Sequence, residues 1–145
     1  MGEIMNTDIL LPIFYLAIFT FSVLIVQSVV RSRAVSNNEH TPEEMFGIPL
    51  PSNASDFIKR LDRNHTNLFE YTVLFYAACI SIYITGKVDD YFILLAYWFV
   101  GFRVIHSMYH IFLNNFISVL PLRAIFFVPS WIILVWIWVR LITSF

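Results

Sequence analysis

Charged side chains are scarce in this chain. Lys, Arg, Asp and Glu together make up 13% of its 145 residues, about half the share found in ordinary soluble domains. So few charges cannot cover a soluble domain of this length, which excludes an ordinary globular protein, a disordered chain and a nucleic-acid binder. The net charge of −1 also leaves no overall field that would recruit a charged partner.

Cysteine and glycine are nearly missing as well. The single cysteine, Cys79, allows no disulfide within the chain, and its apolar surroundings predict an inert thiol rather than a nucleophile. Only four glycines are present, and neither a phosphate-binding glycine loop nor a serine-nucleophile elbow occurs. The sequence therefore offers neither of these two common catalytic motifs.

Long hydrophobic runs are abundant instead, and 59% of the residues are hydrophobic. Four stretches, roughly 9–30, 64–86, 91–113 and 121–144, each reach the about 20 apolar residues that a helix needs to cross a bilayer. They are too long and too continuously apolar for barrel strands. We predict an all-α integral membrane protein, a single domain over residues 1–145 that forms a four-transmembrane-helix bundle with a polar loop at 31–56.

The placement of Lys and Arg predicts the orientation. One side of the predicted bundle carries five basic residues: Arg31, Arg33, Lys59, Arg60 and Arg63. The other side carries only Lys87 and Arg140. Because basic residues collect on the cytoplasmic side of a membrane protein, we expect the first and third loops to be cytoplasmic.

Several polar side chains lie inside the predicted spans or within about one turn of their start, and a charge inside the membrane is costly and usually serves a purpose. They are Arg60, Arg63, Asn67 and Glu70 at the second span, Arg103, His106 and His110 in the third, and Arg123 at the start of the fourth. Antiparallel spans bring all of them to about the same depth. Steps of three and four residues also keep each set on one face of its helix. The pattern predicts one polar site.

Two interpretations of this site remain open. Glu70 and Arg103 could form a buried ion pair that ties two helices together. That pair would leave surplus positive charge, which a bound anion or snorkelling side chains would relieve. Glutathione, with two carboxylates, one ammonium and a thiol, fits this set of groups, and so do anionic lipid headgroups. His106 and His110 lack a third ligand nearby, so we expect no metal.

The residues from Arg63 to Glu70 read Arg-Asn-His-Thr-Asn-Leu-Phe-Glu. This stretch resembles the R-x-x-x-N-x-x-E signature of the MAPEG family, the membrane-associated proteins of eicosanoid and glutathione metabolism. The chain looks most like uncharacterised bacterial members, which also carry an N-L-F-E run. Further positions agree with the family: Arg60, Arg103, His106 and the Pro-Leu-Arg123 that opens the fourth span.

The resemblance implies a homotrimer in the bacterial inner membrane, with glutathione bound as co-substrate between neighbouring subunits. It implies a transferase or peroxidase that acts on a hydrophobic small-molecule substrate, a lipophilic electrophile. Arg63, Asn67 and Glu70 would hold glutathione, and Arg123 would stabilise its thiolate. The remaining implied contacts are Arg31 and Arg60 at the entrance and Arg103, His106 and His110 on the third span.

Three positions depart from the best-known enzymes of this family. His110 stands where a tyrosine is expected, Ala124 stands where prostaglandin E synthases have serine, and Phe127 stands where a tyrosine often packs on glutathione. Prostaglandin and leukotriene synthesis are therefore not expected. The alternative function is a non-catalytic membrane scaffold or lipid-binding member of the family. A transporter is a weaker alternative, because the sequence shows no inverted repeat.

Overall fold

The computed structural model describes residues 6–113 and 125–145 in full, and residues 122–124 by their main chain. Its elements are the helices α1 (Leu10–Ser36), α2 (Pro42–Phe46), α3 (Asp56–Ile84), α4 (Asp90–Phe112) and α5 (Leu122–Thr143). Among the described residues, α1, α3, α4 and α5 are long and apolar enough to cross a membrane. The predicted all-α fold with four transmembrane helices is therefore confirmed.

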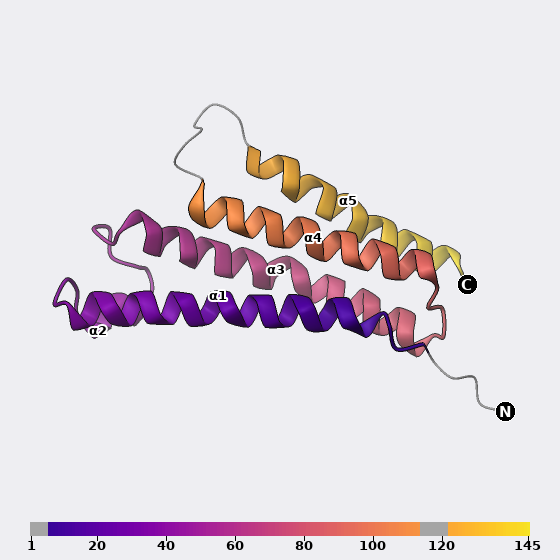
Figure 1. Cartoon of the computed structure of the whole chain (residues 1–145), viewed down its shortest axis with the longest axis horizontal. Helices are drawn as coiled ribbons and strands as arrows, with labels where there is room; N and C mark the ends of the chain where they lie inside the picture. Colours follow the sequence, from indigo (N-terminus) through magenta and orange to yellow (C-terminus); the bar gives the residue numbers. More distant parts are fainter. Residues whose placement is uncertain (1–5, 114–121) are drawn as a thin grey trace.

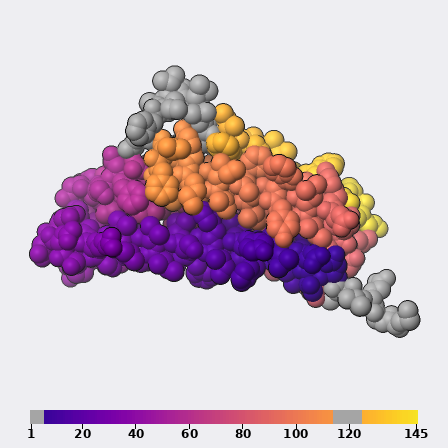
Figure 2. Space-filling model, in the orientation of Figure 1, coloured from indigo at the N-terminus to yellow at the C-terminus, as the bar shows by residue number. Residues whose placement is uncertain are grey.

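The four long helices run alternately up and down in one bundle (Figure 1). Helix α1 packs against α3 and α4, and α5 packs against α4 and α3. The short helix α2 lies beside the C-terminal end of α1. Figure 2 shows one face of the molecule, on which α1 and α4 lie next to each other. This order puts the start of α3 and the end of α4 at the same end of the bundle.

The helices at the first connection are longer than the hydrophobic runs predict. Helix α1 continues to Ser36, and α3 begins at Asp56 rather than near residue 64. Hydropathy marks the membrane interior, whereas a helix continues until a cap ends it. Asn38 follows α1 with a φ of 57°, a left-handed conformation typical of helix C-termini. At α3, the Ser55 hydroxyl accepts a hydrogen bond from the main-chain N–H of Ile58 at 3.3 Å.

The predicted polar loop at 31–56 also contains structure of its own. Helix α2 opens with a capping box, in which the Thr41 hydroxyl accepts from the Glu44 N–H at 3.3 Å and the Glu44 carboxylate accepts from the Thr41 N–H at 2.9 Å. Met45 in this helix is fully buried against Ala34 and Ile58. The connection between the first two spans is therefore anchored to the ends of α1 and α3.

The core of the bundle is apolar and tightly packed. Phe75 of α3 stacks on Phe99 of α4 with ring centroids 4.3 Å apart. Leu16 of α1 and Ile137 of α5 belong to the same fully buried cluster, and so does Cys79. Because lipid tails are as apolar as these side chains, close packing rather than the hydrophobic effect holds such helices together.

An ion pair closes the opposite end of the bundle. Arg140 of α5 donates to both carboxylate oxygens of Asp89, at 2.9 and 2.6 Å. Asp89 also caps α4 by accepting from the Phe92 N–H at 2.8 Å. The hydrogen bonds from Arg140, together with the one from the Phe92 main chain, hold the pKa of Asp89 below its usual range. The pair thus joins the start of α4 to the end of α5.

Replacing Arg140 with glutamine is expected to lower the melting temperature of the purified protein at pH 7. Because both side chains are partly exposed, the loss should stay under about 1 kcal/mol. A carboxyl with a lowered pKa stabilises the fold above its unfolded pKa of about 3.9 and ceases to do so as the pH falls through the folded value. The difference between the two proteins should therefore shrink in acid. An equal difference at pH 7 and pH 2.5, measured beside the exposed Arg33→Gln control, would contradict this role.

Candidate functional site

Polar side chains fix how α3 and α4 lie against each other at the end where α3 begins. Arg60 Nε of α3 donates to the main-chain oxygen of Ile111 of α4 at 3.0 Å. One turn further along α3, Asn64 Nδ2 donates to Ser107 Oγ at 2.7 Å, and both of these side chains are buried. This antiparallel register places the polar residues of the two helices at matching depths, as the order of the spans predicts.

Arg103 lies at the next level of this register and is the largest fully buried side chain described, with 1% of its surface exposed. Its Nη2 donates to the main-chain oxygen of Asn67 at 2.6 Å. The guanidinium carbon lies 5.6 Å from the ring centre of Tyr71 and 5.9 Å from that of Phe127. Its Nε and Nη1 have no hydrogen-bond partner among the described residues. Aromatic faces therefore provide much of the stabilisation of this buried charge.

The ion pair between Glu70 and Arg103 that the sequence left open is not formed within the chain. Arg103 binds a main-chain oxygen instead, and the Glu70 side chain is exposed. Arg63, two turns earlier on α3, is exposed too, and Asn67 between them is half-buried. We call Arg63, Asn67 and Glu70 the α3 polar stripe.

The two histidines of α4 lie inside the bundle. His106 and His110 are both buried, and their ring centres are 6.1 Å apart. His106 also lies 5.5 Å from the ring of Phe127 on α5, which in turn meets Tyr71 edge to face at 5.3 Å. The structure thus brings α3, α4 and α5 together around Phe127.

Arg123, the predicted thiolate-stabilising residue, belongs to the first turn of α5 by its main chain. Its side chain lies outside the described residues, as does the Ala124 side chain. Phe127 follows Arg123 by four residues, so both positions are on the same side of α5. Position 123 is therefore on the side of α5 from which Phe127 contacts α3 and α4.

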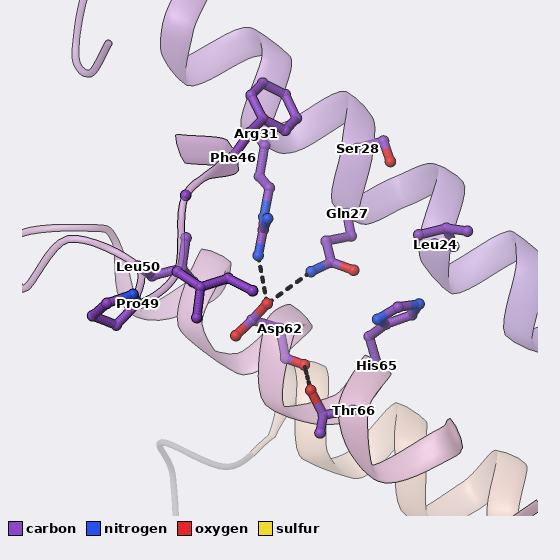
Figure 3. Close-up of a pocket in the computed structure, with 12 residues that line it drawn as sticks. Leu24, Gln27, Ser28, Arg31, Phe46, Pro49, Leu50, Asp62, His65 and Thr66 are labelled. Atoms are coloured by element: carbon purple, nitrogen blue, oxygen red, sulfur yellow. Dashed lines mark hydrogen bonds and ion pairs between the residues drawn. The ribbon is translucent and has the colours of Figure 1, made fainter. Parts of the chain in front are cut away.

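Arg31 takes a different place from the other predicted residues. It reaches from α1 to Asp62 of α3, whose carboxylate oxygen accepts hydrogen bonds from Arg31 Nη2 and, at 3.0 Å, from Gln27 Nε2 (Figure 3). His65 lies beside this group. These four residues, Gln27, Arg31, Asp62 and His65, line a pocket of about 630 Å³, which we call the α1–α3 polar pocket. Within one chain, Arg31 is not part of the α3 polar stripe.

Sequence reasoning missed Gln27, Asn64 and Tyr71, and it considered Asp62 only as an acid near the arginines of the predicted site. Gln27 gave a usable signal, because its amide is the most polar side chain in the first span, whose other polar residues carry only hydroxyl groups. Asn64 gave another, since it follows Arg60 by one turn on the same face. The charge of Asp62 was noticed, but its partners on α1 were not, and Tyr71 gave no signal, because these contacts depend on how the helices pack. Among the described residues, no group of three or more His, Cys, Asp or Glu is arranged to hold a metal ion.

Comparison with known proteins gives one match. The model of the MAPEG family matches residues 9–143, nearly the whole chain. Neither the curated proteins nor the solved structures give a match. The matched range includes all four long helices, the α3 polar stripe and the α1–α3 polar pocket.

Proposed function

The chain belongs to the MAPEG family, and on this basis we propose that it is a membrane-bound, glutathione-dependent transferase or peroxidase acting on lipophilic electrophiles. Family membership supports a glutathione-related role in a membrane. The reaction type, the substrate class and the residues that carry them are our proposal.

The exposed α3 polar stripe carries this proposal. Glu70 lies six residues into the predicted span 64–86, which is roughly 9 Å along the helix at 1.5 Å per residue. A carboxylate facing lipid at such a depth is costly. A polar ligand and a second copy of the chain would together remove Arg63 and Glu70 from lipid. We therefore place the ligand between subunits of a homotrimer, with the stripe as one wall.

Glutathione suits the chemistry of this wall. Glu70 would take the ligand's ammonium, and Arg63 would form a forked pair with one of its carboxylates. Asn67 has a buried side-chain oxygen without a partner among the described residues, which would accept an N–H of the peptide. Arg103 would keep the main chain at Asn67 in position. The remaining predicted residues would complete the site: Arg31 and Arg60 at the entrance, and His106 and His110 on α4.

The chemical step needs the thiol of glutathione as a thiolate. We assign its stabilisation to Arg123, whose charge does not titrate away near neutral pH. The thiol proton would pass to solvent, and the thiolate would attack the electrophilic carbon while the leaving group departs with its electron pair. A free thiol has a pKa of about 8.5, so lowering this value raises the reactive fraction at neutral pH. The lipophilic substrate would arrive through the bilayer.

Phe127 favours the alternative function, a non-catalytic scaffold or lipid-binding protein. Its ring packs against Tyr71 and His106 and over the Arg103 guanidinium. No hydroxyl is available at this position to bind a ligand, and the aromatic cluster makes a stable shell without one. In this interpretation the family's fold is kept and glutathione is not turned over.

The orientation and the compartment belong to the proposal as well. The chain is a multi-pass integral membrane protein. We propose the bacterial inner membrane, with the first and third loops cytoplasmic, because the end of the bundle that carries Arg31, Arg60 and Arg63 is the more basic one. This orientation would give the site access to cytoplasmic glutathione.

Titration of the purified protein with glutathione tests the proposal directly. We expect saturable binding by calorimetry, together with the ultraviolet absorbance of a thiolate at neutral pH. S-methylglutathione is the matched control ligand, because it keeps both carboxylates and the ammonium but cannot form a thiolate. Binding of both ligands with a thiolate signal only for glutathione supports the enzyme. Binding without a thiolate favours the scaffold, and the lack of any binding would overturn the glutathione site.

A further inference from the structure

Two hollows lie next to each other along the seam between α1 and α3. The first is the α1–α3 polar pocket of about 630 Å³, a size typical of small-molecule sites. The second measures about 160 Å³, and its exposed lining is almost entirely apolar, with Ala17 and Phe21 from α1 and Phe69, Val73 and Tyr76 from α3. Thr20 and Thr72 line it too, but their hydroxyls donate to main-chain oxygens of their own helices. We call it the α1–α3 apolar slot.

The two hollows follow each other along the same helix faces. Phe21 of the slot precedes Leu24 of the pocket by three residues on α1, and Phe69 follows Thr66 by three on α3. Residues three or four apart on a helix are neighbours. From Ala17 to Arg31 the seam extends over about 21 Å at 1.5 Å per residue. This is the length of a site for an elongated molecule with one polar end.

The polarity of the seam matches the polarity of a bilayer. The charge-free run of the first span ends at Val30, so Arg31 marks the membrane–water boundary. The pocket at this level is bordered by Phe46 at the end of α2 and by Leu50 in the connection that follows. The slot precedes the pocket on α1 and follows it on α3, and it therefore lies nearer the middle of the membrane. A membrane amphiphile would meet polar groups at its head and apolar groups along its chain.

The polar pocket holds hydrogen-bonding atoms that the protein does not satisfy. Gln27 is 5% exposed, and its Oε1 has no hydrogen-bond partner among the described residues. Arg31 Nε and His65 Nε2 are buried and lack described partners as well. The second carboxylate oxygen of Asp62 accepts no hydrogen bond from the described residues. The buried atoms of Gln27, Arg31 and His65 are costly to leave unpaired, whereas the Asp62 side chain is partly exposed and can bind a ligand directly.

These atoms specify the head of the ligand. A phosphate oxygen would accept hydrogen bonds from Arg31 Nε and from His65. An ammonium group would donate to Gln27 Oε1 and to the Asp62 carboxylate. Arg31 and Asp62 form an ion pair of zero net charge, so a zwitterionic head fits better than one with excess negative charge. A choline head has no N–H to donate. We propose that the α1–α3 seam binds a phospholipid whose head carries a primary ammonium group, with the start of one acyl chain in the apolar slot.

This lipid site lies on the α1 side of α3 and is separate from the α3 polar stripe. It shares Arg31 with the proposed entrance of the glutathione site, so its test uses variants of Gln27 and Phe21, to which the proposed function gives no role. The purified protein is reconstituted in nanodiscs that contain equal amounts of dioleoylphosphatidylethanolamine and dioleoylphosphatidylcholine. Native mass spectrometry then counts the lipids retained per chain. We expect retention of the ethanolamine lipid, favoured over the choline lipid by about tenfold, the ratio that one charge-assisted hydrogen bond provides.

Two variants and a matched control sharpen the test. Gln27→Leu removes the unsatisfied acceptor together with the hydrogen bond to Asp62, and Phe21→Trp fills the apolar slot. Each should lower retention of the ethanolamine lipid several-fold while the melting temperature confirms folding. Asp89→Asn is the control, because it weakens an aspartate–arginine pair at the far end of the bundle, away from the seam. It should retain lipid like the wild type.

Two results would overturn the lipid site. One is that the wild type retains the two lipids equally and that neither seam variant changes the amount retained. The other is a second copy of the chain covering the seam in place of lipid. Ser28 borders the pocket, and Cys79 is fully buried, so Ser28→Cys adds one reactive thiol at the pocket. Disulfide-linked chains under mild oxidation would show a second copy at the seam. We expect instead that a soluble maleimide labels the new cysteine, and that ethanolamine lipid lowers the rate of this labelling.

Discussion

Replacing Glu70 with glutamine is expected to weaken glutathione binding by about tenfold or more while leaving assembly intact. The change keeps the size of the side chain and removes its charge. In the proposed site Glu70 takes the ammonium of glutathione, and a charge-assisted hydrogen bond of this kind contributes roughly 1.5–3 kcal/mol. Within the chain Glu70 is exposed and does not pair with Arg103, so its replacement breaks no described interaction inside the bundle. Calorimetric titration of the purified variant measures the effect.

Glu43→Gln is the matched control for this experiment. Glu43 is an exposed acid on α2, outside the membrane spans, and the same loss of charge there should leave the affinity unchanged. Size-exclusion chromatography shows whether both variants assemble like the wild type. Equal affinity in the Glu70 variant and the wild type would remove Glu70 from the ligand site. A variant that folds but no longer assembles would assign Glu70 to contacts between subunits.

The helical bundle could be predicted from the sequence, because the apolar runs are long enough for membrane-spanning helices and too long for the strands of a membrane barrel. The ends of its helices could not. The charged residues after Val30 suggest a loop, yet α1 continues to Ser36 and α3 begins at Asp56. A helix outside the membrane is stopped by caps such as Ser55 rather than by a fall in hydropathy.

For the candidate site, the sequence predicts the depth of the polar side chains in the membrane but not the partners that they bind. The alternation of the spans places Arg60 and Arg103 near the same end of the bundle, and the contacts to α4 and α3 agree with this. Charge alone suggested that Arg103 binds Glu70. Its guanidinium instead donates to a main-chain oxygen of α3 and lies over the rings of Tyr71 and Phe127. Arg31 similarly binds Asp62 across the α1–α3 seam. Such choices depend on the rotation of each helix about its axis, which packing decides.

Replacing Arg123 with alanine is expected to have the largest effect on catalysis. The main chain of residue 123 lies in the first turn of α5, one turn before Phe127, whose ring contacts α3 and α4. A cation from this position would face the sulfur, while Arg63, Asn67 and Glu70 hold the ends of the ligand. Glutathione should therefore still bind to the variant, a few-fold more weakly. The pKa of its bound thiol should rise toward the free value of about 8.5.

Thiolate absorbance of the bound ligand, measured against pH for both proteins, gives this pKa directly. Turnover with 1-chloro-2,4-dinitrobenzene should fall in the variant at neutral pH and partly recover as the pH rises, because hydroxide then supplies the thiolate that the arginine no longer favours. Arg33→Ala, which removes an exposed arginine at the end of α1, is the matched control and should titrate like the wild type. Identical titration curves for wild type and the Arg123 variant would exclude Arg123 from activation of the sulfur. If the wild-type thiol also titrates near 8.5, the protein binds glutathione without activating it, and the scaffold function is the one that the chemistry supports.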